Sequence, residues 1–247
     1  MNFLHEGLLE LGFEAGEFSG IKILPLENIE EKMEKYIAAL QEYNAKFDLI
    51  NADEHDEIAI RHILDSLSAL PKICAEISRR WSERLSETNS ESDSEQKNFS
   101  LADIGSGAGL PGIPLASCLP QFHFTLVERM TKRCGFLNHC AQILNLKNVE
   151  VEENQAERLE QNRFDLCVFR AFRPLDKKMA KVLLRILKPD GILAAYKAKK
   201  EKIIEEMESL PQNPKYEILP LKVPFLTENT DAGEERERNL VIIEKNL

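Results

Sequence analysis

The chain has 247 residues, 43% of them hydrophobic and 30% charged, a composition typical of one large α/β domain with or without a small appendage. No apolar run approaches the about 18 to 20 residues that span a membrane, and the first residues lack a cleavable signal, so we expect a cytoplasmic protein that does not enter a membrane. The net charge of −10 argues against a nucleic-acid partner, but between Arg129 and Lys202 there are 17 Lys and Arg against 9 Asp and Glu, which leaves room for a basic face.

The N-terminal part has the periodicity of amphipathic helices. Apolar residues recur on one stripe between about residues 28 and 47, and the stretch 56–70 repeats the pattern. Residues 86–98 contain no apolar side chain, so we expect a flexible acidic insert there. The predicted organisation is therefore an N-terminal helical cap over residues 1–85, the insert over 86–98, and a second domain over 99–247.

Strand-like and helix-like segments alternate after the insert, which predicts a parallel sheet covered by helices. The predicted strands cover residues 99–104, 123–128, 149–153, 164–169 and 191–197. The predicted helices lie around residues 112–119, 131–146, 174–188 and 199–209. Two last apolar runs, 216–225 and 238–245, are joined without a helix and predict an antiparallel hairpin at the sheet edge.

The five cysteines indicate neither a zinc site nor a disulfide framework, because their number is odd and no C-x-x-C pair occurs. We therefore expect reduced, mostly buried thiols and no bound metal.

The first predicted strand runs into the glycine-rich stretch LADIGSGAGLPGIPLA, residues 101–116. A P-loop needs Lys followed by Ser or Thr after its last glycine, whereas Gly112 precedes Ile113 and Pro114. The dinucleotide fingerprint needs glycine at position 110, which is Leu110. Proline also removes N–H donors near the helix start, so a phosphate ligand is disfavoured.

The remaining interpretation is a loop that binds S-adenosylmethionine. Asp103 ends the strand and could face the ammonium group of that ligand, while Gly105 and Gly107 let the backbone approach it. Glu128 ends the next strand, where a carboxylate accepts hydrogen bonds from ribose hydroxyls. Residues 155–157 follow the third strand, at the place expected for an adenine-edge contact. Without these spacings, the loop would be merely a tight turn with solvated carboxylates nearby.

Residues 164–175 cover the fourth predicted strand and the loop after it, where the chemistry of the methyl acceptor is usually visible. No Asn/Asp-Pro-Pro-aromatic turn is present, and Cys167 lies within the strand, so we expect it to be buried rather than nucleophilic. Arg170 ends that strand and either contacts ligand or is a surface cation, and Phe172 and Arg173 either contact RNA or pack. An acceptor such as guanine N7 has its own lone pair and needs no general base, so alignment would supply most of the catalysis.

The glycine stretch, together with RHILDS at 61–66, YNAKFDLIN at 43–51, FRAF at 169–172 and AYKAK at 195–199, resembles the bacterial small-subunit rRNA guanine-N7 methyltransferases, also known as glucose-inhibited division protein B. The similarity runs from about residue 28 onwards and skips the insert. It implies a Rossmann-like class I methyltransferase sheet with an N-terminal helical cap, methylation of guanine N7 in 16S rRNA of the small ribosomal subunit, and S-adenosylmethionine as cofactor.

The resemblance places cofactor contacts on Gly105, Leu110, Glu128, Ala156, Glu157 and Arg170, to which Asp103, Ser106 and Gly107 of the loop are added. It also draws attention to Arg61, His62 and Asp65 as substrate-site residues, together with Phe172, Arg173 and Lys197. No residue is predicted as a general base, and Arg170 is the candidate for a catalytic part.

Structural interpretations of these residues stay open. Arg61 and Asp65 could pair with each other at i and i+4, His62 could cap or pack, and Lys197 could be solvated. We expect a monomer. The alternative functions are a methyltransferase for a small molecule or protein, and a nucleotide-binding module without catalysis.

Overall fold

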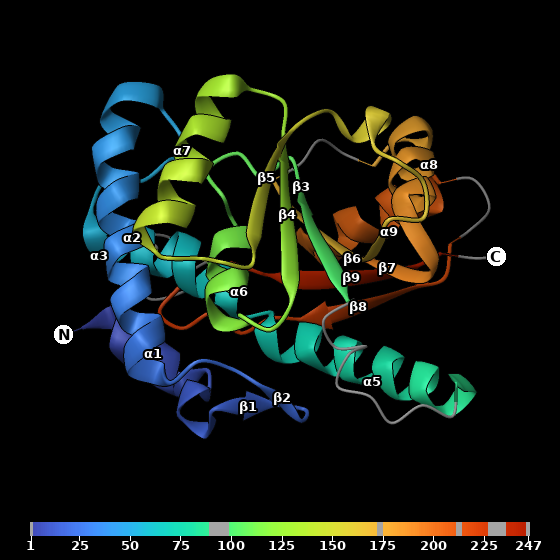
Figure 1. Cartoon of the computed structure of the whole chain (residues 1–247), viewed down its shortest axis with the longest axis horizontal. Helices are drawn as coiled ribbons and strands as arrows, with labels where there is room; N and C mark the ends of the chain where they lie inside the picture. The colour runs from blue at the N-terminus through green and yellow to red at the C-terminus, as the bar shows by residue number, and fades with distance from the viewer. Residues whose placement is uncertain (1, 89–98, 172–174, 211–213, 227–235, 246–247) are drawn as a thin grey trace.

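A seven-stranded sheet in the order β5-β4-β3-β6-β7-β9-β8 forms the centre of the molecule (Figure 1). The computed structural model describes residues 2–88, 99–171, 175–210, 214–226 and 236–245, and no helix in these ranges is long and apolar enough to cross a membrane. The strands are β3 (Ser100–Ile104), β4 (His123–Glu128), β5 (Val149–Glu153), β6 (Phe164–Arg170), β7 (Leu187–Lys197), β8 (Tyr216–Pro220) and β9 (Asn239–Glu244). Strands β3 to β7 are parallel, while β9 is antiparallel to both β7 and β8.

Each predicted strand and each predicted helix of this part is present, and the predicted Rossmann-like arrangement is confirmed. The helices that follow the glycine stretch are α6 (Gly112–Cys118), α7 (Thr131–Ile143), η4 (Ala156–Arg158), α8 (Lys177–Ile186) and α9 (Lys200–Glu208). The predicted edge hairpin is also confirmed, with β9 between β7 and β8. Some boundaries differ. Residues 187 and 188 belong to the long strand β7 and not to the preceding helix, α7 ends at Ile143, and β8 ends at Pro220 and not at residue 225.

Successive side chains of the parallel strands point to opposite faces of the sheet and pack in two separate cores. In β6, Leu166 and Val168 face the core that contains α2, α6 and α7, while Cys167 and Phe169 face the core that contains α8 and α9. Because both faces are covered, strands β3, β4 and β6 are buried over most of their length, as expected for a parallel sheet, whereas the edge strand β5 alternates Val with Glu. The two helical layers lie on opposite sides of the sheet in Figure 1.

The N-terminal helices share the first of these cores with the sheet. The elements are α1 (Phe3–Glu10), η1 (Phe13–Ala15), β1 (Glu17–Phe18), β2 (Ile21–Lys22), α2 (Leu26–Phe47), α3 (His55–Ile58), η2 (Ala59–Leu64), α4 (Asp65–Leu67) and α5 (Leu70–Thr88). Met33 and Tyr36 of α2 are fully buried in the same cluster as Leu126 of β4. The division into a cap and a second domain stays a prediction. Helix α5 continues three residues past position 85, and residues 89–98 of the predicted insert lie outside the described residues.

The segment that carries RHILDS is not a regular α-helix. Its residues 59–64 form a π-helical segment, η2, in which the backbone turn is wider than in an α-helix. The sequence periodicity predicts helix here but not this widening. The segment lies against the carboxyl end of β6, because the Arg61 carbonyl accepts a hydrogen bond from Arg170 at 3.4 Å.

Candidate functional site

Most N–H groups of the glycine loop between β3 and α6 donate to acceptors within the protein. The Val127 carbonyl accepts the N–H groups of Gly105 and Ser106 at 2.9 and 3.0 Å, and the Ser106 carbonyl accepts those of Gly109 and Leu110 at 2.7 and 3.3 Å. A phosphate would bind through such donors, which already have partners here. The structure therefore agrees with the sequence argument against a phosphate-binding loop.

Glycine is required in this loop for conformational reasons. Gly105 and Gly107 have φ values of +72° and +56°, in the left-handed region that side chains rarely adopt. The N-terminal helices support the loop from outside, since the Tyr36 hydroxyl of α2 donates to the Ala108 carbonyl at 2.5 Å and is fully buried. Leu110 is also buried, and it packs in the core between these helices and the sheet.

Asp103 lies behind the loop and does not line a described cavity. Its carboxylate is fully buried, and Oδ2 accepts the N–H of Gly112 at 3.0 Å, which fixes the start of α6. Oδ1 is buried without a hydrogen-bond partner among the described residues. Burial raises the pKa of Asp103 to about 7. Ser106 has a similar supporting position, because its hydroxyl donates to the Asp103 carbonyl at 2.9 Å. The sequence predicts a cofactor contact for both residues, but neither lines a described cavity.

Glu128 ends β4 and is held by three backbone donors. Its Oε1 accepts the N–H groups of Arg129 and Met130 at 2.8 and 2.9 Å, and Oε2 accepts that of Gly107 at 3.0 Å. The residue is only 4% exposed. A carboxylate offers about four acceptor positions, so this arrangement leaves capacity for one further donor.

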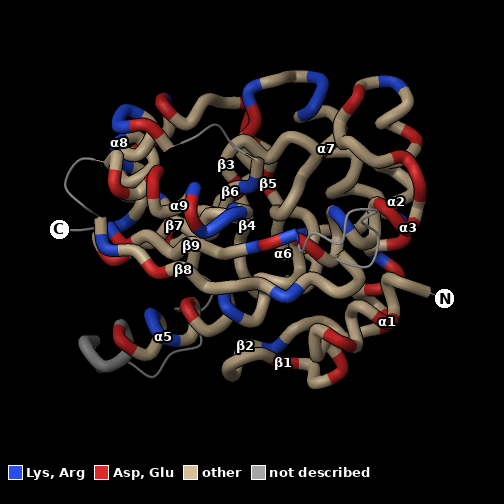
Figure 2. The backbone as a smooth tube through the Cα atoms, turned by 180° about the vertical axis from the view of Figure 1, so that it is seen from behind, with Lys and Arg blue, Asp and Glu red and all other residues tan. Residues whose placement is uncertain are grey.

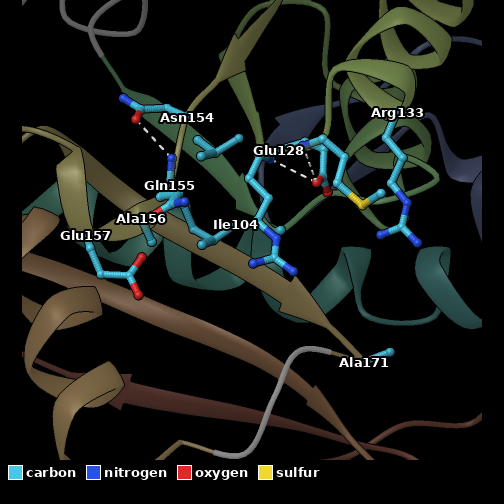
Figure 3. Close-up of a pocket in the computed structure, with 12 residues that line it drawn as sticks. Ile104, Glu128, Arg133, Asn154, Gln155, Ala156, Glu157 and Ala171 are labelled. Carbon is cyan, nitrogen blue, oxygen red and sulfur yellow. Dashed lines mark hydrogen bonds between the residues drawn. The ribbon is translucent and has the colours of Figure 1, made fainter.

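A cavity of about 330 Å³ opens at the carboxyl ends of β3, β4 and β5, between the glycine loop and η4. Four of the predicted cofactor residues line it, namely Gly105, Glu128, Ala156 and Glu157. Figure 3 shows that Glu128 comes from one side of the cavity and residues 154–157 from the other. The apolar wall consists of Ile104, Val127, Met130 and Ala156. The cavity therefore combines an apolar slot with a fixed carboxylate.

Several residues of this wall are not predicted from the sequence. Arg129 and Met130 directly follow Glu128, Asn154 follows β5, and Ala171 follows β6. Because ligands of open α/β sheets bind at the carboxyl ends of the strands, the first residues after each strand were the available signal. Arg133 lies one helical turn further on and carried no such signal.

Arg170 is placed in a cluster of charges and not on the wall of this cavity. Its Nη1 donates to Asp65 Oδ2 at 2.7 Å, and Arg238 Nε donates to Asp65 Oδ1 at 3.0 Å. The Asp65 side chain is 6% exposed and that of Arg170 is 14% exposed. One buried carboxylate therefore joins two arginines from β6 and from the start of β9.

Arg61 and Asp65 do not pair, so that expectation is wrong. Arg61 forms an ion pair with Glu57 instead. The π-helical turn has more residues per turn than an α-helix, so positions 61 and 65 do not stack on one face.

His62 packs beside Arg170 as a neutral ring. Its Nδ1 lies 3.2 Å from Arg170 Nη2. Burial, together with the charges of Arg170, Arg61 and Arg238, lowers the pKa of His62 to about 3. Because arginine only donates, Nδ1 is the acceptor and Nε2 carries the proton.

A second cavity of about 280 Å³ has Arg170 in its wall. Its wall includes Asp65, Arg170, Lys197, Arg238 and Ala171, and Ala171 also lines the first cavity. The predicted substrate residues Asp65 and Lys197 are thus brought together here. Lys197 is not solvated, because its ammonium group pairs with Glu206 at 2.8 Å and its side chain is 14% exposed.

Phe172 and Arg173, predicted to contact substrate, lie outside the described residues. Cys167 is fully buried within β6, as expected, and burial raises the pKa of its thiol well above the usual value. The other four cysteines are also buried. These thiols are therefore part of the core.

Comparison with known proteins agrees with this geometry. The family described as rRNA small subunit methyltransferase G matches residues 29–82 and 75–240. A protein of Treponema denticola named ribosomal RNA small subunit methyltransferase G is 38% identical over 98% of this chain and 93% of its own length. Proteins with the same name from Hydrogenovibrio crunogenus and Bacillus pumilus are 37% and 31% identical, covering 87% and 93% of this chain and 84% and 87% of their own.

Proposed function

The chain belongs to the rRNA small subunit methyltransferase G family, and from this premise we propose that it transfers a methyl group from S-adenosylmethionine to N7 of a guanine in 16S ribosomal RNA. The observation that carries the proposal is the pair of cavities that meet at Ala171, one with a fixed carboxylate and one with arginines. The alternative functions, transfer to a small molecule or protein and binding without catalysis, have no comparable support.

The first cavity fits the nucleoside part of S-adenosylmethionine. Glu128 has acceptor capacity left beside its three backbone bonds, which suits a ribose hydroxyl. Met130, Val127 and Ala156 would enclose an adenine ring, since their side chains form the apolar wall. Glu157 lines the same wall. Gly105 leaves the space that the ligand needs against the loop, and Asp103, Ser106, Gly107 and Leu110 would act through the shape of that loop.

The second cavity is the proposed position of the guanine. It adjoins the first at Ala171, so a base held there would lie beside the methyl donor. Arg170 and Arg238 share the single carboxylate of Asp65, which leaves an excess of positive charge that attracts the RNA backbone. We propose that Lys197, Arg61 and His62, together with Phe172 and Arg173, complete the substrate site.

The reaction needs alignment more than proton transfer. S-adenosylmethionine supplies a methyl group on a positively charged sulfur. The lone pair of guanine N7 would take this methyl group directly, with the electron pair of the carbon–sulfur bond left on sulfur and the positive charge passed to the purine. No proton leaves N7, so no general base is required. Arg170, whose guanidinium stays protonated, would position the end of β6 instead of serving as a base.

The proposed substrate also favours a cytoplasmic location, because that is where ribosomal RNA is found in a bacterium. We further propose that the protein acts as a monomer. Light scattering coupled to gel filtration would test this, and a mass near twice 28.2 kDa would contradict it.

The decisive test is methyl transfer to 16S rRNA. The protein should transfer labelled methyl groups from S-adenosylmethionine to 16S rRNA or to small subunits that lack the modification, and cleavage specific for N7-methylguanine should map them to one nucleotide. Labelling at another atom would overturn the N7 assignment. Transfer only to protein or to small molecules, insensitive to ribonuclease, would overturn the RNA substrate.

A further inference from the structure

An aromatic and cationic surface lies beside the first cavity, where α2 ends and α7 begins. We name it the Phe47 surface and define it by Tyr43, Lys46 and Phe47 of α2 and Lys132 of α7. The two helices lie side by side in Figure 1, and Figure 2 shows Lys and Arg segments at this edge of the molecule near α7. Lys132 lies between Met130 and Arg133 in the chain, and both of these line the first cavity.

Its aromatic rings form a ladder that runs from the core to solvent. The ring of buried Phe136 is 4.9 Å from that of Tyr43, and the ring of Tyr43 is 6.0 Å from that of Phe47, measured between centroids. Phe47 at the outer end is 42% exposed. The ladder holds an exposed aromatic side chain in place, so a stacking partner would find it already ordered.

One lysine lies against each of the two outer rings. Lys132 Nζ is 5.9 Å from the Phe47 centroid, and Lys46 Nζ is 5.7 Å from the Tyr43 centroid. Lys46 also pairs with Glu42 at 3.2 Å. By contrast, Arg129, Lys132 and Arg133 form no ion pair with any acidic residue that the structure describes.

The position of these cations adds a second argument. All three lie at the start of α7, where positive charge opposes the helix dipole and does not stabilise the helix. They are also next to a cavity that already contains the proposed cofactor site. Positive charge at this position does not stabilise the helix, but it can bind an anionic ligand.

We propose that the Phe47 surface binds a single-stranded nucleotide of ribosomal RNA that neighbours the target guanine, with its base stacked on Phe47 and a phosphate near Lys132. This inference rests on the function proposed above and adds a second contact to it. Unpaired RNA bases stack on aromatic side chains, and nearby lysines and arginines hold the backbone. RNA is a polyanion with stacking bases, and this surface offers it one exposed ring beside Lys132, a cation without an acidic partner among the described residues.

The test uses the full chain with three substitutions outside the cavities. With deproteinised 16S rRNA and labelled S-adenosylmethionine, Phe47→Ala should raise KM for RNA about tenfold, the scale of one lost base stack, with kcat retained. Phe47→Trp should restore KM, because it keeps a stacking face. Lys132→Ala should lower the slope of log KM against log salt by about one. S-adenosylmethionine affinity, measured by calorimetry, should stay unchanged in all three.

Two matched controls separate this surface from general effects. Tyr216→Ala removes another exposed aromatic ring, 36% exposed on β8, and Lys72→Ala removes an exposed lysine of α5. Both should leave KM and its salt dependence unchanged. If the unaltered protein methylates 16S rRNA but Phe47→Ala and Lys132→Ala behave like these controls, the Phe47 surface is overturned alone. If the unaltered protein methylates no RNA, the proposed function itself fails. Dimer dissociation caused by Phe47→Ala would assign the surface to a second copy of the chain and overturn RNA binding.

Discussion

Asp65 and Arg170 form a buried ion pair between segments 105 positions apart, with Arg170 Nη1 donating to Asp65 Oδ2 at 2.7 Å. The pair joins the N-terminal helices to the carboxyl end of β6. Since Arg238 binds the other oxygen of Asp65, one side chain fixes three segments around the second cavity. A single substitution should therefore affect both the stability of the protein and the shape of the proposed guanine site.

Asp65→Asn should lower the free energy of unfolding by about 3 kcal/mol, because removing one partner of a buried ion pair leaves the remaining charges without compensation. Urea unfolding followed by circular dichroism would measure the loss. Glu31→Gln is the control, since it breaks the exposed pair between Glu31 and Lys35, which should not change stability measurably. Equal results for both substitutions would show that the Asp65 cluster does not hold the segments together.

Glu128→Gln should weaken S-adenosylmethionine binding by tenfold or more. Three backbone N–H groups point at the carboxylate, and a carboxamide offers them one oxygen and one NH₂ group, so a donor would face a donor. Titration calorimetry would measure the change. Glu150→Gln on the neighbouring strand β5, a side chain that is 59% exposed, should bind as the unaltered protein does. An unchanged affinity for Glu128→Gln would remove Glu128 from the cofactor site.

Asp103 should make stability fall as pH rises. Its folded pKa of about 7 lies above the ordinary value of 3.8, so the folded state holds a proton that the unfolded state has lost between these values. The contribution is fully present below about pH 4 and is lost by about pH 7, at roughly 1.4 kcal/mol per pH unit. The free energies of unfolding of the unaltered protein and of Asp103→Asn, measured as a function of pH, should therefore diverge between about pH 4 and pH 7. His62 is common to both proteins, so its effect cancels, and parallel curves would contradict the prediction.

Two glycines should respond in opposite ways to alanine. A Cβ at Gly112 would lie 2.6 Å from Asp103 Oδ2 and 2.5 Å from Leu126 Cδ2, whereas at Gly135 it would meet nothing within 4 Å. Gly112→Ala should therefore cost about 1 to 3 kcal/mol through overpacking, and it should also weaken cofactor binding by moving the loop. Gly135→Ala should stabilise helix α7 by about 0.5 to 1 kcal/mol. Thermal unfolding of the two variants would check both signs.

The sequence was sufficient to predict the elements and one half of the site. The inner strands could be predicted because both faces of a parallel sheet are apolar, and Glu128 because it ends a strand at a fixed distance from Gly107. Gly105, Ala156 and Glu157 also lie where they were expected, on the wall of one cavity. These are local properties, and sequence spacing describes them well.

The other half depends on contacts between distant segments. No periodicity connects Asp65 with Arg170 or Arg238. The sequence therefore suggested Arg61, one helical turn away, as the partner of Asp65, and the π-helical segment prevents that pair. The position of Asp103 behind the loop also depends on packing between separate elements and could not be predicted from spacing. Strand and loop position indicated a ligand contact, while the contact with Gly112 depends on how α6 packs.

The position of β9 has a consequence for the order in which the molecule can be completed. Strand β8 is made before β9, yet it pairs only with β9 among the described strands. During synthesis β8 therefore has no strand to pair with, and one edge of β7 stays without a hydrogen-bonded neighbour, until residues 239–244 have left the ribosome. Arg238 precedes β9 directly, so the charge on the second cavity is also set at that last step. A nascent chain could thus hold the cofactor pocket before it has a finished place for the RNA base.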